Sequence, residues 1–167
     1  VPLLAREVTE ARAVGATVVY TQDWHPPRTP HFRSWGGVWP DHCVQSTPGA
    51  QLHSDLSTQT IARVFQKGER REVDSYSGFF DNDHATSTGL GEFLKEQGTT
   101  KVYACGLATD YCVKYSALDA QKLGFQTFLI EDAARGVNMN AADVKKAVEE
   151  MRAAGVEILS SAEILST

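Results

Sequence analysis

The chain has 167 residues, which is enough for one domain with a sizeable core, over residues 1–167, and too short for two full ones. Its net charge is −5, without a basic block to neutralise phosphates or an apolar run near the roughly 20 residues of a membrane span, which argues against nucleic-acid and membrane partners. Three cysteines are an odd, sparse set, unlike a disulfide-rich secreted scaffold, and they predict a reducing, cytoplasmic location.

Apolar runs of strand type alternate with helical patterns along the chain. The expected elements, in chain order, are a helix at 3–14, strands at 16–23 and 61–68, a helix at 86–97, a strand at 101–108, a helix at 110–123, a strand at 125–133, a helix at 141–154 and a weaker strand at 156–161. A glycine separates each helix from the next strand at Gly15, Gly98, Gly124 and Gly155. This alternation predicts an α/β fold, a single-domain α/β/α sandwich around a mostly parallel sheet.

Polar side chains follow the first three strands. The first strand runs into Asp23 and His25, the second ends at Lys67, and the third leads through "GLATDYC" to Cys112. Ligands of an open parallel sheet bind beyond the carboxyl ends of its strands. We therefore expect these four side chains to gather at one edge of the sheet.

Cys112 is expected in the first turn of a helix that Thr109 or Asp110 caps. Free N–H groups and the helix dipole there lower the pKa of a thiol and can face an oxyanion. The same position suits a small side chain that packs the helix onto the sheet, so both interpretations stay open. Cys105 is expected in the core, and Cys43 is expected to serve packing.

Two further kinds of residue suit chemistry or an ordinary surface. Lys67 could supply positive charge beside a thiolate and an oxyanion, or be a solvated lysine. One carboxylate and three imidazoles within 20 residues suit a divalent ion such as zinc, iron or manganese, although each alone is commonly a surface residue: Asp23, His25, His31 and His42. His53 and His84 lack such neighbours and are expected to be structural or solvated.

Four segments carry a family resemblance. "DWHPPRTPHF", "WPDHCVQSTPGA", "VFQKG" with "DSYSGF", and "GLATDYCV" together resemble the nicotinamidases/pyrazinamidases of the isochorismatase-like cysteine hydrolases. The resemblance runs from about residue 12 to 138, with the motifs in the same order and with similar spacing. It implies hydrolysis of nicotinamide, or of pyrazinamide, to the acid and ammonia, with one divalent ion, zinc before iron or manganese.

The resemblance also implies a role for each matching residue. The catalytic pair is Cys112 as nucleophile and Lys67 as triad lysine. The metal ligands are Asp23, His25, His31 and His42. The oxyanion hole is formed by the amides of Ala108 and Cys112, after a cis peptide bond at Leu107–Ala108. The substrate pocket is lined by Trp39, Tyr76, Leu107 and Tyr111.

The sequence departs from the family in one respect. The third triad member is an aspartate on the first, central strand, and no residue before Asp23 matches it. Asp110 is interpreted as a helix cap and not as that base. We expect the missing strand and aspartate to lie upstream of the numbered chain, because a sheet without its central strand would leave backbone groups unpaired.

Three other functions stay open at this point. The chain could be a related amidase or isochorismatase-type hydrolase with another small substrate. It could be a metal hydrolase in which Cys112 only packs, or a catalytically inactive metal-binding module. The composition leaves the oligomeric state open.

Overall fold

The computed structural model describes residues 1–56 and 61–164, which form two compact units. The first unit comprises Val1–Ser75 and Phe80–Thr88, and the second comprises Tyr76–Phe79 and Gly89–Thr167. The search of the described residues finds no helix with the length and apolar character that a bilayer crossing requires.

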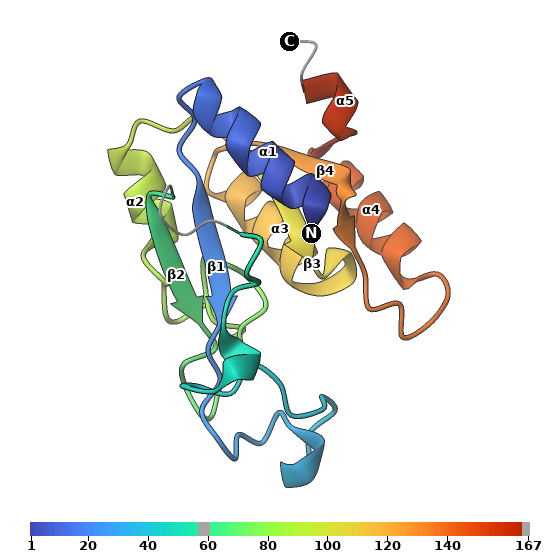
Figure 1. The fold of residues 1–167 in the computed structure, drawn as a ribbon. Helices are drawn as coiled ribbons and strands as arrows, with labels where there is room; N and C mark the ends of the chain where they lie inside the picture. Colours follow the sequence, from blue (N-terminus) through green and yellow to red (C-terminus); the bar gives the residue numbers. More distant parts are fainter. Residues whose placement is uncertain (57–60, 165–167) are drawn as a thin grey trace. The chain divides into compact units, whose positions relative to one another are not determined.

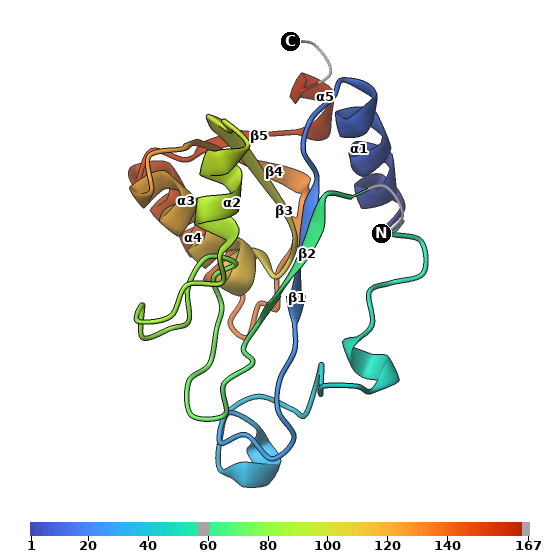
Figure 2. The ribbon, with the colours of Figure 1, turned by 90° about the vertical axis from the view of Figure 1, so that its left-hand side faces the viewer.

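A parallel pair of strands organises the first unit. Helix α1 (Pro2–Ala13) leads through Gly15, at φ +80°, into β1 (Val19–Asp23), and β2 (Arg63–Lys67) runs beside β1 in the same direction (Figures 1 and 2). Their register pairs Asp23 with Lys67 at the carboxyl ends. The pairing therefore brings two of the predicted site residues together through the backbone alone.

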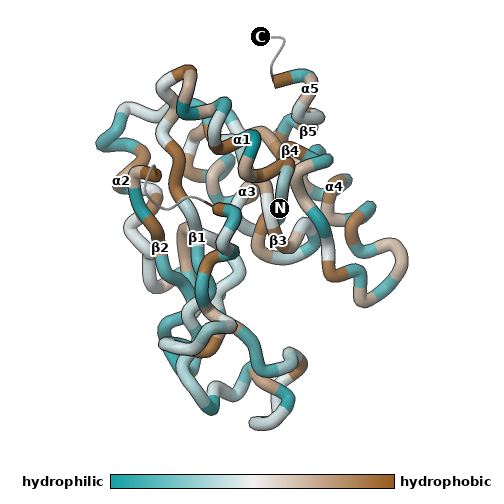
Figure 3. The backbone as a smooth tube through the Cα atoms, in the orientation of Figure 1, coloured by the Kyte–Doolittle hydropathy of each residue, from teal (hydrophilic) through white to brown (hydrophobic). Residues whose placement is uncertain are grey.

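The long segment after β1 is tied back to the strand ends by local backbone contacts. It carries the short 3₁₀ helices η1 (Arg33–Trp35) and η2 (Pro48–Ala50), and its tube is largely teal to white beyond the strand ends (Figure 3). Isolated bridges join His25 to Val44 and Phe32 to Trp39. These bridges constrain the backbone of a hydrophilic loop.

The second unit contains a three-stranded parallel sheet in the order β3–β4–β5. Its elements are α2 (Leu90–Glu96), β3 (Lys101–Leu107), the π-helix η3 (Thr109–Val113), α3 (Lys114–Lys122), β4 (Gln126–Arg135), α4 (Asp143–Ala153), β5 (Glu157–Leu159) and α5 (Ser161–Ile164). Helices α3 and α4 pack against each other and against the sheet. The core between them includes Ala117, Leu129 and Met151, each with 0% of its surface exposed.

The predicted α/β class, with parallel pairing, is confirmed by both sheets. The positive φ angles of Gly15, Gly98, Gly124 and Gly155 confirm left-handed residues after four of the helices, a conformation that glycine adopts without steric penalty. Cys105 was expected in the core, but it is exposed. It shares a face with the other exposed residues of β3, because side chains alternate between the two faces of a strand.

Candidate active site and metal centre

Three side chains at and beyond the carboxyl end of β1 form a group with metal-ligating character. Asp23, His25 and His42 each offer one ligand atom, and these atoms lie within 4.8 Å of one another. His25 lies in the loop directly after β1. Its backbone N–H donates to the backbone carbonyl of Cys43, and this bond brings His42, the residue before Cys43, close to His25. A carboxylate oxygen and two imidazole nitrogens are a donor set that zinc and related divalent ions accept.

Backbone carbonyls orient both imidazole rings. Nδ1 of His25 lies 3.3 Å from the carbonyl oxygen of Gly68, and Nδ1 of His42 lies 2.8 Å from that of Pro40. A carbonyl oxygen only accepts hydrogen bonds, so Nδ1 is the donor in each of these contacts, and Nε2 is the ring nitrogen left to face an ion. This arrangement fixes the tautomer in the way that metal-ligating histidines require.

Burial keeps His25 neutral. The residue is 3% exposed, and this desolvation lowers the pKa of its imidazole below the usual value, although the Asp23 and Asp74 carboxylates oppose the shift. The ring of Phe32, itself 1% exposed, lies against both imidazoles, with centroids 5.8 Å from His25 and 5.5 Å from His42. The neutral form of an imidazole is the one that binds a metal ion, because it has a free lone pair.

A buried ion pair connects this group to Lys67. The Lys67 ammonium, 3% exposed, lies 2.5 Å from one oxygen of Asp23, and it donates to the carbonyl of Ser75 at 2.7 Å. The other oxygen of Asp23 lies 4.0 Å from Nε2 of His25. The carboxylate thus lies between the lysine and the imidazole group, and Lys67 is a buried charge with specific partners instead of a solvated lysine.

His31 and Trp39 lie in the same loop, where the N–H of Trp39 donates to the carbonyl of His31 at 3.1 Å. His31 is outside the metal group found among the described residues, but its Nε2 is buried and has no hydrogen-bond partner there. An unpaired buried nitrogen is unfavourable, and binding an ion would relieve it. The Trp39 ring lies 6.5 Å from that of His42.

The turn that carries Cys112 is built differently from the helix start that the sequence predicts. The peptide bond at Leu107–Ala108 is cis, as the resemblance implies. Residues 109–113 form a π-helix, in which the N–H of Val113 donates to the carbonyl of Ala108. Neither Thr109 nor Asp110 caps it through a side chain, so the predicted helix cap is wrong.

Two neighbouring contacts hold the Cys112 turn. The hydroxyl of Ser116 donates to the carbonyl of Cys112 at 2.6 Å and accepts the N–H of Gly78 at 2.8 Å. The ring of Tyr76 packs edge-on against Tyr111, with centroids 5.4 Å apart. The segment 76–79 is therefore fastened to the turn, and two of the predicted pocket residues touch each other. Leu107, a third, is 74% exposed.

The predicted site is thus divided between the two units. Asp23, His25, His42 and Lys67 meet in the first, whereas Cys112 lies in the second. Their meeting in one cavity stays a prediction. Sequence reasoning missed Ser75 and Ser116, whose contacts depend on the fold, and Gly68, which the motif "QKG" could have suggested.

Comparisons with known proteins show the family of this chain. A sequence profile of the family described as "Isochorismatase domain" matches residues 1–163. The nicotinamidase of Escherichia coli (strain K12) is 43% identical over 164 residues, which cover 89% of this chain and 77% of that protein. The chain belongs to the isochorismatase family.

Solved structures of isochorismatase-family proteins have the same fold. The Acinetobacter baumanii nicotinamidase/pyrazinamidase superposes with a TM-score of 0.87 at 37% identity, covering 96% of this chain and 86% of that one. The pyrazinamidase of Pyrococcus horikoshii in complex with zinc gives 0.84 at 38% identity, covering 95% and 83%. Zinc is bound in the second of these structures.

The position of the His25 ring in this isochorismatase-family chain requires a glycine at residue 68. Gly68 has φ +68°, and a Cβ there would come within 2.6 Å of Cε1 and Nδ1 of His25. We expect Gly68→Ala to displace the ring and lower the affinity for a divalent ion, with zinc as the probe, by about tenfold or more, as losses around metal ligands commonly do. Zinc titration with a competing chromophoric chelator measures the affinity.

Gly98 provides the matched control for that experiment. It has the same φ of +68°, but a Cβ there meets nothing within 4 Å. Gly98→Ala should therefore share the backbone strain, and some loss of stability, while zinc affinity stays at the wild-type value. Equal zinc affinities in the two variants would contradict the role assigned to the Gly68 site.

Proposed function

We propose that this chain is a metal-dependent nicotinamidase that hydrolyses nicotinamide to nicotinate and ammonia through a thioester on Cys112, with pyrazinamide as a second substrate. The observation that carries the proposal is the group formed by Asp23, His25 and His42 beside the buried Lys67. The Escherichia coli nicotinamidase, which is 43% identical to this chain, is an amidohydrolase, and this reaction class agrees with the residues of the site.

The residues present fit a divalent ion. Two oriented Nε2 atoms and one carboxylate oxygen already lie within 4.8 Å of one another, and the unpaired Nε2 of His31 offers a fourth ligand. When bound, a divalent ion would attract the ring nitrogen of a pyridine or pyrazine carboxamide and so orient the substrate. Zinc is the first choice, because it is the metal named with the Pyrococcus horikoshii relative.

Cys112 is proposed as the nucleophile. Its sulfur would attack the carboxamide carbon after a general base takes the thiol proton, giving a tetrahedral intermediate. The amides of Ala108 and Cys112 would face the oxyanion. The proton would pass to the carboxamide nitrogen, which leaves as ammonia when the C–N bond breaks. Water would then attack the thioester, releasing nicotinate and restoring the thiol.

Lys67 is proposed as the positively charged partner of the reaction. Its ammonium is buried and already paired with Asp23 and the carbonyl of Ser75, so its position is fixed. A fixed cation stabilises a thiolate more than a solvated one does, because burial weakens screening by water. Lys67 would thereby favour ionisation of Cys112 without donating a proton itself.

We propose that Lys67 and Cys112 serve the same reaction, as the family resemblance implies. The substrate pocket is proposed to be lined by Trp39, Tyr76, Leu107 and Tyr111. Within the second unit, the ring of Tyr76 packs against that of Tyr111, which agrees with a shared role of these two residues.

Ammonia release from nicotinamide and from benzamide tests the proposal. Benzamide has the same carboxamide but no ring nitrogen to reach the imidazole group. We expect zinc-loaded protein to hydrolyse nicotinamide with a kcat/KM at least about a hundredfold above that for benzamide, because orientation contributes several kcal/mol. Equal rates would contradict recognition of the ring nitrogen, and no release from either would contradict the proposed activity.

A further inference from the structure

One buried carboxylate beside Cys112 has no role in the proposed chemistry. Asp110 is 6% exposed and accepts two backbone hydrogen bonds, from the N–H of Val137 at 2.9 Å and of Asn138 at 2.7 Å. Each oxygen takes one of these bonds. The side chain therefore fastens the connection between β4 and α4 to the π-helix that carries Cys112.

The fastened segment is itself well defined. Asn138 has φ +53°, and its side-chain oxygen accepts the N–H of Val144 at 3.1 Å. A Cβ at Gly136 would come within 3.1 Å of the Asp110 carboxylate, so the backbone approaches Asp110 closely there. A carboxylate that accepts two backbone N–H groups replaces the pairing that a regular element would give them.

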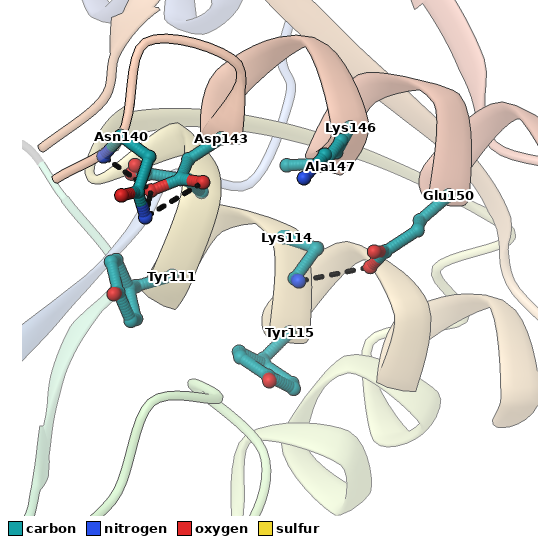
Figure 4. A pocket seen from close by; sticks show the side chains of 9 residues that line it. Tyr111, Lys114, Tyr115, Asn140, Asp143, Lys146, Ala147 and Glu150 are labelled. Atoms are coloured by element: carbon teal, nitrogen blue, oxygen red, sulfur yellow. Dashed lines mark hydrogen bonds and ion pairs between the residues drawn. The ribbon is translucent and has the colours of Figure 1, made fainter. Parts of the chain in front are cut away.

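The far end of this segment touches Tyr111. The Tyr111 hydroxyl lies 3.5 Å from the sulfur of Met139, to which it donates. Burial and the nearby Asp110 carboxylate raise the pKa of Tyr111, so the hydroxyl keeps its proton. Tyr111 and Tyr115 line a cavity of about 260 Å³. In Figure 4 the hydrogen-bonded Asn140 and Asp143 lie above these two rings.

We propose that Asp110 is a positioning residue that holds the Val137–Met139 segment against Tyr111 and thereby sets the place of the Tyr111 ring. The inference rests on the proposed function in one respect, since Tyr111 is assigned to the substrate pocket there. Asp110 acts through the loop and does not touch substrate. Its loss should therefore weaken substrate binding more than the chemical step.

Steady-state kinetics with nicotinamide test the proposal in Asp110→Asn. The amide keeps the size of the carboxylate but presents a donor to one of the two N–H groups. We expect KM to rise about tenfold while kcat stays within about threefold of wild type. Met139→Ala, at a residue 54% exposed, should raise KM in the same direction without threatening the fold.

The double variant separates a shared path from two independent effects. If the loop carries the effect of Asp110, Met139→Ala should add little to the KM of Asp110→Asn. Two KM effects that multiply fully would overturn the proposal, as would an unchanged KM in either single variant. If Asp110→Asn does not fold, Met139→Ala alone tests the proposal: a higher KM supports it, and an unchanged KM overturns it.

Asp132 provides the matched control. Its carboxylate also accepts a backbone N–H, at 2.8 Å, and a hydroxyl, at 2.6 Å, both from Ser161. Asp132→Asn should lower stability and leave KM unchanged. A KM rise equal to that of Asp110→Asn would show a general loss of stability and overturn the proposal.

Hydrogen exchange tests the positioning role without the enzyme assay. If wild type hydrolyses no nicotinamide, the proposed function fails, but this second test still applies. Faster exchange in residues 109–113 and 136–140 of Asp110→Asn, and not of Asp132→Asn, would support the positioning role, and unchanged exchange would overturn it.

Discussion

Cys112→Ala should lower kcat for nicotinamide by at least about a thousandfold, the loss that removal of a covalent nucleophile produces. Alanine removes only the sulfur, and the half-buried site tolerates the smaller side chain. The π-helix backbone, the zinc content and the unfolding midpoint should stay near those of wild type. Ammonia release measured with a coupled assay, on protein of known zinc content, gives the rate.

Cys105→Ala is the control for that result. Cys105 is an exposed thiol on β3 of the same unit. Its replacement should leave kcat within about twofold of wild type, as for an ordinary exposed substitution. A Cys112→Ala enzyme that keeps most of its activity would instead favour a hydrolase in which the metal group generates the nucleophile and Cys112 serves packing.

His42→Ala should remove zinc binding and lower kcat/KM for nicotinamide by at least about a hundredfold, because loss of a ligand weakens the site and the substrate loses its orientation. His42 is the ligand of choice for this test, because His25 is buried against Phe32 and supports the fold. Metal analysis after dialysis measures the zinc, and the same assay measures the rate.

Two controls define the interpretation of His42→Ala. His53→Ala changes an exposed histidine of the same unit, outside the metal group, and should keep zinc and activity. Chelation of wild type should reproduce the His42→Ala rate, and added zinc should restore wild type alone. Full activity of zinc-free wild type would contradict metal dependence.

The order of strands and helices could be predicted because each carries a periodic pattern. Every strand predicted from residue 16 onward is present, with ends within a few residues of those expected, and the metal group follows from Asp23 and His25 at the end of β1. Parallel pairing then explains the contact between Asp23 and Lys67. These features depend on local sequence and on one rule of sheet topology.

Other features depend on contacts between distant segments. Asp110 has the sequence position of a helix cap, but its partners are Val137 and Asn138, 27 and 28 residues away. The same holds for Ser116, whose hydroxyl contacts Gly78. A side chain that can satisfy local or distant donors equally well gives no signal in the sequence.

The rate at which iodoacetamide alkylates Cys112, followed by mass spectrometry of its peptide, tests most directly whether the sulfur and the imidazole group face one ligand. In zinc-loaded protein, saturating nicotinate should slow alkylation by about tenfold or more, because a ligand anchored at Asp23, His25 and His42 would cover the sulfur. In His42→Ala the protection should disappear. Nicotinate that binds zinc-loaded protein, as seen by calorimetry, without slowing alkylation of Cys112 would contradict the account.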